Sequence, residues 1–219
     1  DLAMMEALNK YDRPFHQRAI EMVIPALSPA EVGAMLHLDA VDAFDAYLVT
    51  GGLPLICKEW KPGMSLWGYL EQALNSPTSA LIVSGERSLA AEFPPTAQPR
   101  EVLSAIGSGE RTFTNIARAA GDLQQATLLR SLKVLTAKRI VVAELPLSTQ
   151  SARETRYRIT DPHLRFWLAF LDRNLAEIER GRGDRVLERI QKSWPSWRGR
   201  AIEPVVKESI DRLPAAQRP

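Results

Sequence analysis

The residues best suited to ligand chemistry form the hexapeptide Thr50-Gly51-Gly52-Leu53-Pro54-Leu55. Glycine adopts backbone conformations that other residues avoid, and proline carries a rigid apolar ring at a fixed φ. Two glycines ahead of a proline therefore allow a sharp turn that brings this ring close to a neighbouring surface. From its spacing alone, the hexapeptide is either such a ligand contact or only a junction between two helices.

A second candidate is a basic helix expected over residues 123–137, where Leu128, Leu132 and Leu135 recur on one face. No acidic residue lies between Gln124 and Arg139. Phosphates attract a basic helix whatever the DNA sequence, and polar residues at its start can reach base edges. The candidate DNA contacts are Gln124, Gln125, Thr127, Arg130 and Lys133. The alternative is an ordinary solvated basic face.

The sequence lacks the residues that several other kinds of site or segment require. A single cysteine, Cys57, excludes a disulfide framework and a cysteine-based zinc site, and the three histidines form no local metal motif. No stretch has the roughly 20 apolar residues of a membrane span, and no signal peptide is visible. We therefore expect a cytoplasmic protein without membrane contact. Because the first residue is Asp1 rather than methionine, we also expect a fragment of a longer protein.

Charge is distributed unevenly over the 219 residues. The net charge is +2 overall, yet residues 1–98 carry 6 basic and 12 acidic side chains, and residues 99–165 carry 11 and 6. Such a difference between segments is typical of separate modules, and the middle module is the better candidate for an anionic partner.

The elements that must position these residues are mostly helices. Ser28-Pro29-Ala30-Glu31 is a strong helix start, with a capping hydroxyl, a proline at the first position and a glutamate at the third. Gly51 ends the helix expected from Val41 to Thr50. The proline-rich stretch 93–98 is expected to be a linker, because proline removes backbone donors and restricts the preceding residue.

After the linker, the pattern predicts helices over 100–106, 114–120 and 123–137, followed by strands over 140–145 and 156–159. Three helices and a hairpin are the arrangement of a winged helix-turn-helix. From Asp161 the chain returns to helix, with further helices expected around 186–193 and from about 199 onward.

Five stretches of the chain resemble the bacterial and archaeal ATPases of the AAA+/STAND class, in which a P-loop domain precedes a helical lid, a winged helix and a C-terminal nuclease-like region. In these proteins a Gly-x-Pro motif in the lid packs its proline on adenine. The similar stretches are 1–5, 15–18, 50–55, 157–167 and 197–203; Gln17 departs from the glycine that the family often has.

The resemblance implies a nucleotide site made of Gly51, Gly52 and Pro54 against adenine, Arg18 toward the terminal phosphate and His163 toward the β-phosphate. From the residues alone, the reading favoured for Arg18 is a surface or salt-bridged arginine, and the reading favoured for His163 is packing or capping. The sequence has no Gly-x-x-x-x-Gly-Lys-[Ser/Thr] loop. We therefore expect ATP or ADP to be held, with magnesium, by a P-loop domain before Asp1, and no ATP hydrolysis by these residues.

Together these observations predict a mainly α fold: a small helical lid bundle, a winged helix-turn-helix of three helices and a β-hairpin, and a C-terminal helical connector. The expected divisions are a remnant of the P-loop domain (1–25), the lid (26–92), the linker (93–98), the winged helix (99–161) and the connector (162–219). The expected function is a regulatory one, in which nucleotide state sets the position of the winged helix, its partners being the P-loop domain, a C-terminal domain and DNA. The alternative is a stand-alone winged-helix transcriptional regulator.

Overall fold

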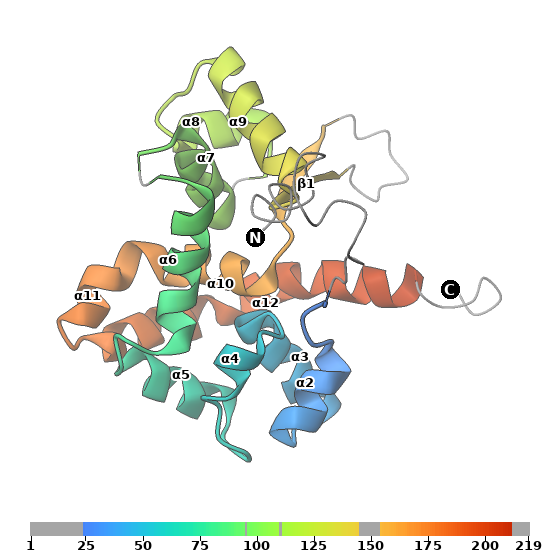
Figure 1. The fold of residues 1–219 in the computed structure, drawn as a ribbon, viewed down its shortest axis with the longest axis vertical. Helices are drawn as coiled ribbons and strands as arrows, with labels where there is room; N and C mark the ends of the chain where they lie inside the picture. The colour runs from blue at the N-terminus through green and yellow to red at the C-terminus, as the bar shows by residue number, and fades with distance from the viewer. Residues whose placement is uncertain (1–23, 95, 110, 145–153, 212–219) are drawn as a thin grey trace, which may run out of the picture. The chain divides into compact units, whose positions relative to one another are not determined.

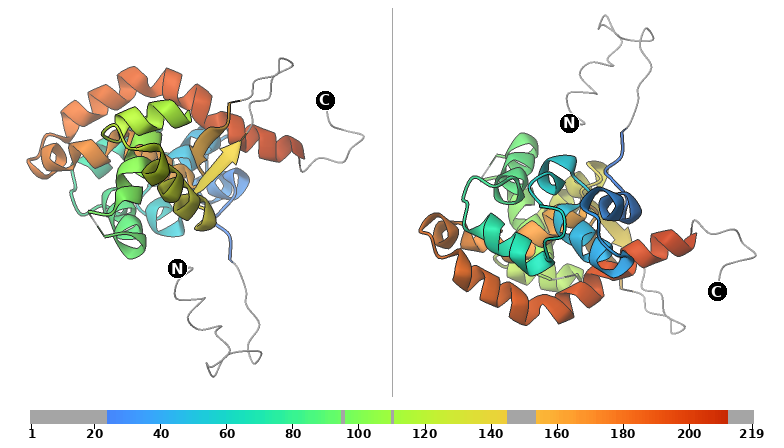
Figure 2. Two further views of the ribbon diagram at one scale, coloured as in Figure 1. Left: turned by 90° about the horizontal axis from the view of Figure 1, so that it is seen from above. Right: turned by 90° about the horizontal axis from the view of Figure 1, so that it is seen from below.

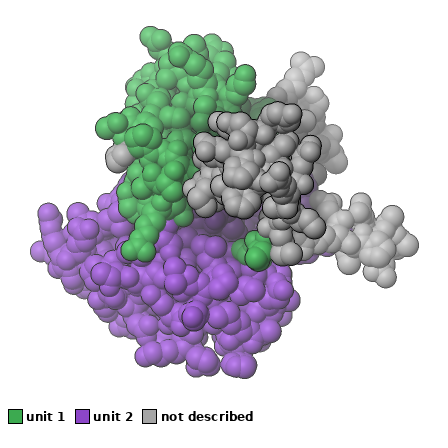
Figure 3. Space-filling view, viewed as in Figure 1, with its two compact units in different colours: residues 1–26, 86–160 green, residues 27–85, 161–219 purple. Residues whose placement is uncertain are grey.

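The structure is a computed structural model, and it describes residues 24–94, 96–109, 111–144 and 154–211. It is mainly helical with a two-stranded antiparallel sheet, as the sequence predicts (Figure 1). The chain divides into two compact units, coloured separately in Figure 3. We call residues 86–160 the α/β unit, and residues 27–85 with 161–211 the helical unit.

The α/β unit contains the three helices and two strands predicted after the linker. The helices are α7 (Gln98–Gly107), α8 (Phe113–Ala119) and α9 (Gln125–Ala137), and the strands are β1 (Val141–Glu144) and β2 (Arg156–Ile159). The strands pair antiparallel, with Val141 opposite Ile159 and Glu144 opposite Arg156. Its core holds side chains from all three helices and both strands: Val102, Leu103, Ile116, Leu128, Leu132, Leu135, Val141 and Ile159.

The helical unit is built from helices of both halves of the chain, all of them short except the last. They are α2 (Pro29–Leu36), α3 (Ala40–Thr50), α4 (Pro54–Cys57), α5 (Leu66–Leu74), the start of α6 (Ala80–Glu92), α10 (Pro162–Phe170), the 3₁₀ turn η1 (Asp172–Asn174), α11 (Leu175–Glu179) and α12 (Gly183–Asp211). Trp167, fully buried on α10, donates from Nε1 to the carbonyl of Ile82 on α6 at 2.8 Å.

This arrangement joins two segments that the sequence analysis separates. Residues 27–85 of the predicted lid and residues 162–211 of the predicted connector pack into one unit, because α3 and α10 bury their apolar faces against each other. Short amphipathic helices gain most of their stability from such packing. The helices break in the predicted linker at 93–98, since α6 ends at Glu92 and α7 begins at Gln98, but the two units divide within α6, between Gly85 and Glu86.

Local signals at the helix ends are confirmed. Ser28 and Glu31 form a reciprocal capping box at the start of α2. Gly51 caps the end of α3 in the left-handed conformation, with φ at +64°.

The predicted break between residues 193 and 199 is wrong. A single helix, α12, runs from Gly183 to Asp211 through Pro195 and Pro204 and curves along the helical unit (Figure 2). Proline costs a helix one hydrogen bond and bends it. Here Trp194 and Trp197 are buried on either side of the exposed Pro195, so their packing holds the bent helix together.

Candidate functional site

The turn between α3 and α4 is held by hydrogen bonds of the Thr50 side chain and of its own backbone. The hydroxyl of Thr50 donates to the carbonyl of Ala46 at 2.8 Å and accepts from the amide of Gly52 at 3.3 Å. The amide of Leu53 donates to the carbonyl of Thr50 at 3.1 Å. Pro54 then takes the first position of α4, where no amide donor is needed.

Both glycines of this turn are required by sterics as well as by backbone conformation. Gly52 has φ at +68°, and a β-carbon there would overlap the carbonyl oxygen of Leu27. The amide of Leu27 also donates to the carbonyl of Gly52 at 2.9 Å, which locks the two segments together. A β-carbon on Gly51 would lie 2.8 Å from the β-carbon of His163. The turn therefore has a single tightly determined shape.

This rigid turn presents an apolar tip to solvent. Gly51, Gly52, Ile56 and Cys57 are buried, whereas Pro54 and the following Leu55 are exposed, Leu55 by 61%. An exposed leucine beside an exposed proline on a fixed backbone suits a flat apolar ligand surface. Leu55 is not among the contacts predicted from the sequence, although its place directly after the proline is the signal that could have identified it.

His163 lies behind the turn, in the first turn of α10. Its side chain is only 2% exposed, and its Nδ1 donates to the carbonyl of Val49 at 3.0 Å. Burial lowers its pKa, although the bond to Val49 and the charge of Asp161 oppose this, so the ring is neutral. Its Nε2 has no hydrogen-bond partner among the described residues. In this arrangement His163 supports Gly51 from inside and presents no atom to a ligand in solvent.

The structure thus brings four of the five predicted nucleotide contacts into one place. Gly51, Gly52 and Pro54 form the turn, and His163 packs against its back. Arg18, the fifth, lies outside the described residues, as does most of the predicted P-loop remnant at 1–25.

The predicted DNA contacts lie on α9 and in the residue before it. Gln124, Gln125, Arg130 and Lys133 are exposed and Thr127 is half-buried. The opposite face of α9 is buried and consists of Leu128, Ser131, Leu132 and Leu135. Two exposed apolar side chains, Leu129 and Val134, flank the basic ones and were not assigned from the sequence.

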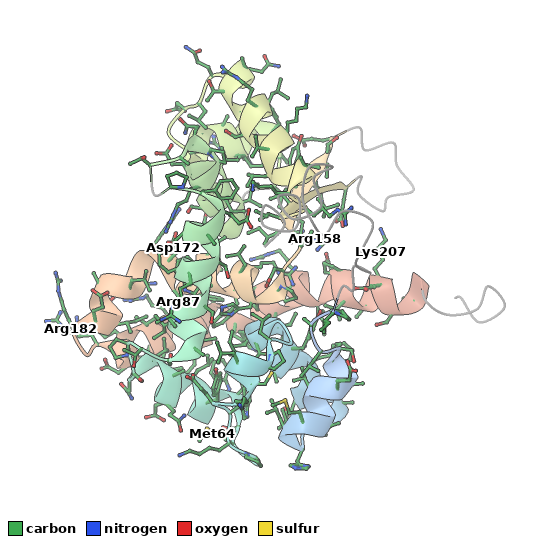
Figure 4. The ribbon with its side chains drawn as sticks, viewed as in Figure 1. Met64, Arg87, Arg158, Asp172, Arg182 and Lys207 are labelled. Atoms are coloured by element: carbon green, nitrogen blue, oxygen red, sulfur yellow. The ribbon has the colours of Figure 1, made fainter. Side chains whose placement is uncertain are left out.

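The charge on α9 is not neutralised locally. In the described part of the α/β unit, the ion pairs use other residues: Arg100 with Glu86, Lys138 with Glu92, and Arg158 with Glu144 (Arg158 is labelled in Figure 4). Among these described pairs none involves Arg130 or Lys133. Their charges are therefore available to an anionic partner.

The described residues contain no group of three or more histidine, cysteine, aspartate or glutamate side chains placed to hold a metal ion. Their helices also include none with the length and apolar character needed to cross a lipid bilayer.

The chain is similar to a distant archaeal relative among known proteins. The chain is 25% identical over 170 residues to an uncharacterized protein of the archaeon Methanocaldococcus jannaschii. The match covers 77% of this chain but 38% of the archaeal protein, so the chain spans well under half the length of that relative. No protein-family model and no solved structure matches the chain.

Proposed function

We propose that this chain is the nucleotide-responsive regulatory part of a cytoplasmic ATP-binding protein. The observation that carries the proposal is the tip formed by Pro54 and Leu55, which is exposed although the backbone beneath it is buried and sterically fixed. In the proposed mechanism this tip covers the adenine of ATP or ADP. A P-loop domain before residue 1 holds the phosphates and magnesium, as the resemblance to AAA+/STAND ATPases implies.

Rigidity and apolar character together favour a purine as the ligand. A flat heterocycle gains contact area from the proline ring and the leucine side chain, and a preformed surface avoids the entropy cost of ordering a loop on binding. Lys58, exposed one turn further along, adds a positive charge near the same tip.

In the proposed mechanism the same turn passes nucleotide state to the α/β unit. The chain crosses from that unit into the helical unit between Thr160 and Asp161. Asp161 caps α10, accepting from the amide of Leu164 at 2.9 Å, and lies with His163 directly against Gly51. A nucleotide that favours one arrangement of the turn therefore acts at this crossing point. Such a shift requires unequal nucleotide affinity for the two arrangements.

Nucleotide titration of the full-length protein tests the proposal. Replacing Pro54 with alanine removes two ring carbons but keeps a residue that suits the first position of a helix. At about 0.8 kcal/mol per buried methylene, we expect ATP and ADP affinity to fall about tenfold. Pro62→Ala is the matched control, since Pro62 is also exposed and lies in the turn after α4. Equal affinity in the Pro54→Ala variant and the wild type refutes the proposal.

A second candidate function is DNA binding by the α/β unit as a winged helix. The observation that favours it is the exposed Arg130 and Lys133 on α9, which form no ion pair with any described residue, and the lack of an acid on that helix. Binding of the chain to duplex DNA over a series of salt concentrations tests this function. Phosphate contacts make affinity fall steeply with salt. If the chain does not bind duplex DNA even at low salt, DNA binding is refuted and the α/β unit is a joint between domains.

A further inference from the structure

Arg165 and residues 197–203 belong to two stretches singled out in the sequence; none of them is among the predicted nucleotide contacts, yet they meet inside the helical unit. Arg165 on α10 donates from Nη2 to the carbonyl of Ala201 on α12 at 2.7 Å. Its guanidinium also lies 6.0 Å from the ring centre of Trp197, within the range of a cation–π contact.

An aromatic cluster surrounds this contact. Trp197 packs edge-on against Phe166 and Phe170, with ring centres 5.7 and 5.3 Å apart. Trp194, one turn earlier on α12, lies 5.2 Å from Trp197. Edge-on aromatic pairs of this kind add to the stabilisation from burial alone, so α12 is firmly attached to α10 at this point.

The same stretch of α12 also holds α3. Arg198 donates from Nε to Oδ1 of Asp45 at 2.5 Å, and the Asp45 side chain is only 15% exposed. Burial raises the pKa of Asp45, and the bond and charge of Arg198 act against that rise. Asp45 lies on α3 less than two turns before Gly51, and Arg165 lies one turn after Asp161 on α10.

We infer that Arg165 and Arg198 are positioning residues that shape the Gly51–Gly52 turn from α12. We call the set Asp45, Arg165, Trp197, Arg198 and Ala201 the clamp. It fixes α12 to the two helices whose ends build the candidate site, namely the end of α3 and the start of α10. The clamp makes α12, which continues past it to Lys207 (Figure 4), a regulatory arm of that site. This regulatory role rests on the proposed function.

If the clamp sets the shape of the turn, a partner that binds α12 and shifts it changes nucleotide affinity, and nucleotide binding must change the affinity for that partner by the same factor.

Hydrogen exchange of the ligand-free protein tests the first step without any nucleotide. Arg198→Ala should raise the exchange of the Gly52 and Leu53 amides by between about twofold and thirtyfold, the range typical of such indirect effects. The control is Arg200→Ala, because Arg200 is exposed and donates to Ser196 on its own helix. Asp45→Asn, which keeps the shape of the side chain, carries the test if Arg198→Ala does not fold. Unchanged exchange in the folded variant overturns the inference.

Nucleotide titration of the full-length protein separates this inference from the proposed function. We expect Arg198→Ala to weaken nucleotide affinity by the same range, Arg198→Lys to restore part of it, and Arg200→Ala to leave it unchanged. If Pro54→Ala weakens binding and Arg198→Ala does not, the clamp inference fails alone. If Pro54→Ala has no effect, the proposed function fails, and the exchange experiment still decides whether the clamp shapes the turn.

Discussion

Three glycine-to-alanine changes test how tightly the candidate turn is determined. Gly63, Gly51 and Gly52 all have positive φ, at +76°, +64° and +68°, but a β-carbon meets different surroundings at each. At Gly63 it meets nothing within 4 Å, at Gly51 it lies 2.8 Å from the β-carbon of His163, and at Gly52 it overlaps the backbone of Leu27. The series therefore separates the cost of backbone conformation from the cost of the clash.

The expected losses in the free energy of unfolding follow from these surroundings. Gly63→Ala costs only the left-handed conformation, roughly 1–2 kcal/mol, partly offset by the lower entropy of the unfolded chain, so we expect about 1 kcal/mol. Gly51→Ala must also displace His163, and overpacking adds about 1–3 kcal/mol. Gly52→Ala must move the backbone of Leu27 and break its hydrogen bond, so we expect about 4 kcal/mol or more.

Tryptophan fluorescence during urea unfolding measures these changes in the free energy of unfolding for the helical unit, which contains the turn. All five tryptophans, at positions 60, 67, 167, 194 and 197, lie in the helical unit, so the signal reports on that unit. A shift of the midpoint at constant m gives the change in stability. If Gly52→Ala costs no more than Gly63→Ala, then the contact between Gly52 and Leu27 does not constrain the turn and the argument for a rigid tip fails.

The remaining predictions concern His163 and α9. Because burial lowers the pKa of His163 below its ordinary value of 6.5, the unfolded chain binds a proton that the folded one does not. The free energy of unfolding should therefore fall as pH drops below about 6.5, by up to about 1.4 kcal/mol per pH unit. His163→Gln should flatten this fall in fluorescence-monitored urea titrations, and an unaltered pH profile counts against a neutral buried ring. For α9, Arg130→Ala and Lys133→Ala should each reduce by about 1 the slope of log affinity for DNA against log salt concentration. Lys192→Ala on α12 is the control and should leave this slope unchanged. Equal slopes in all three variants exclude phosphate contact by α9.

Local chemistry predicted most of the helix ends and the order of the elements. The capping box at Ser28, the stop at Gly51 and the apolar spacing of α9 each depend on residues within a few positions of one another. The turn that carries Pro54 could be found from the sequence for the same reason, because the glycines and the proline act through their own backbones.

The residues that pack against that turn, and those that hold its two helices, are determined by the tertiary structure. His163 meets Gly51 across more than a hundred residues, and Arg198 meets Asp45 across a still longer separation. Pro195 marks a helix end by local rules, yet the aromatic cluster on either side of it keeps α12 continuous. Contacts between distant residues leave no periodic trace in either segment, since each side chain has several possible partners until the chain folds. The sequence therefore determines the local backbone conformation of the turn and the helix ends. The contacts that support the turn depend instead on which apolar helix faces pack together when the chain folds.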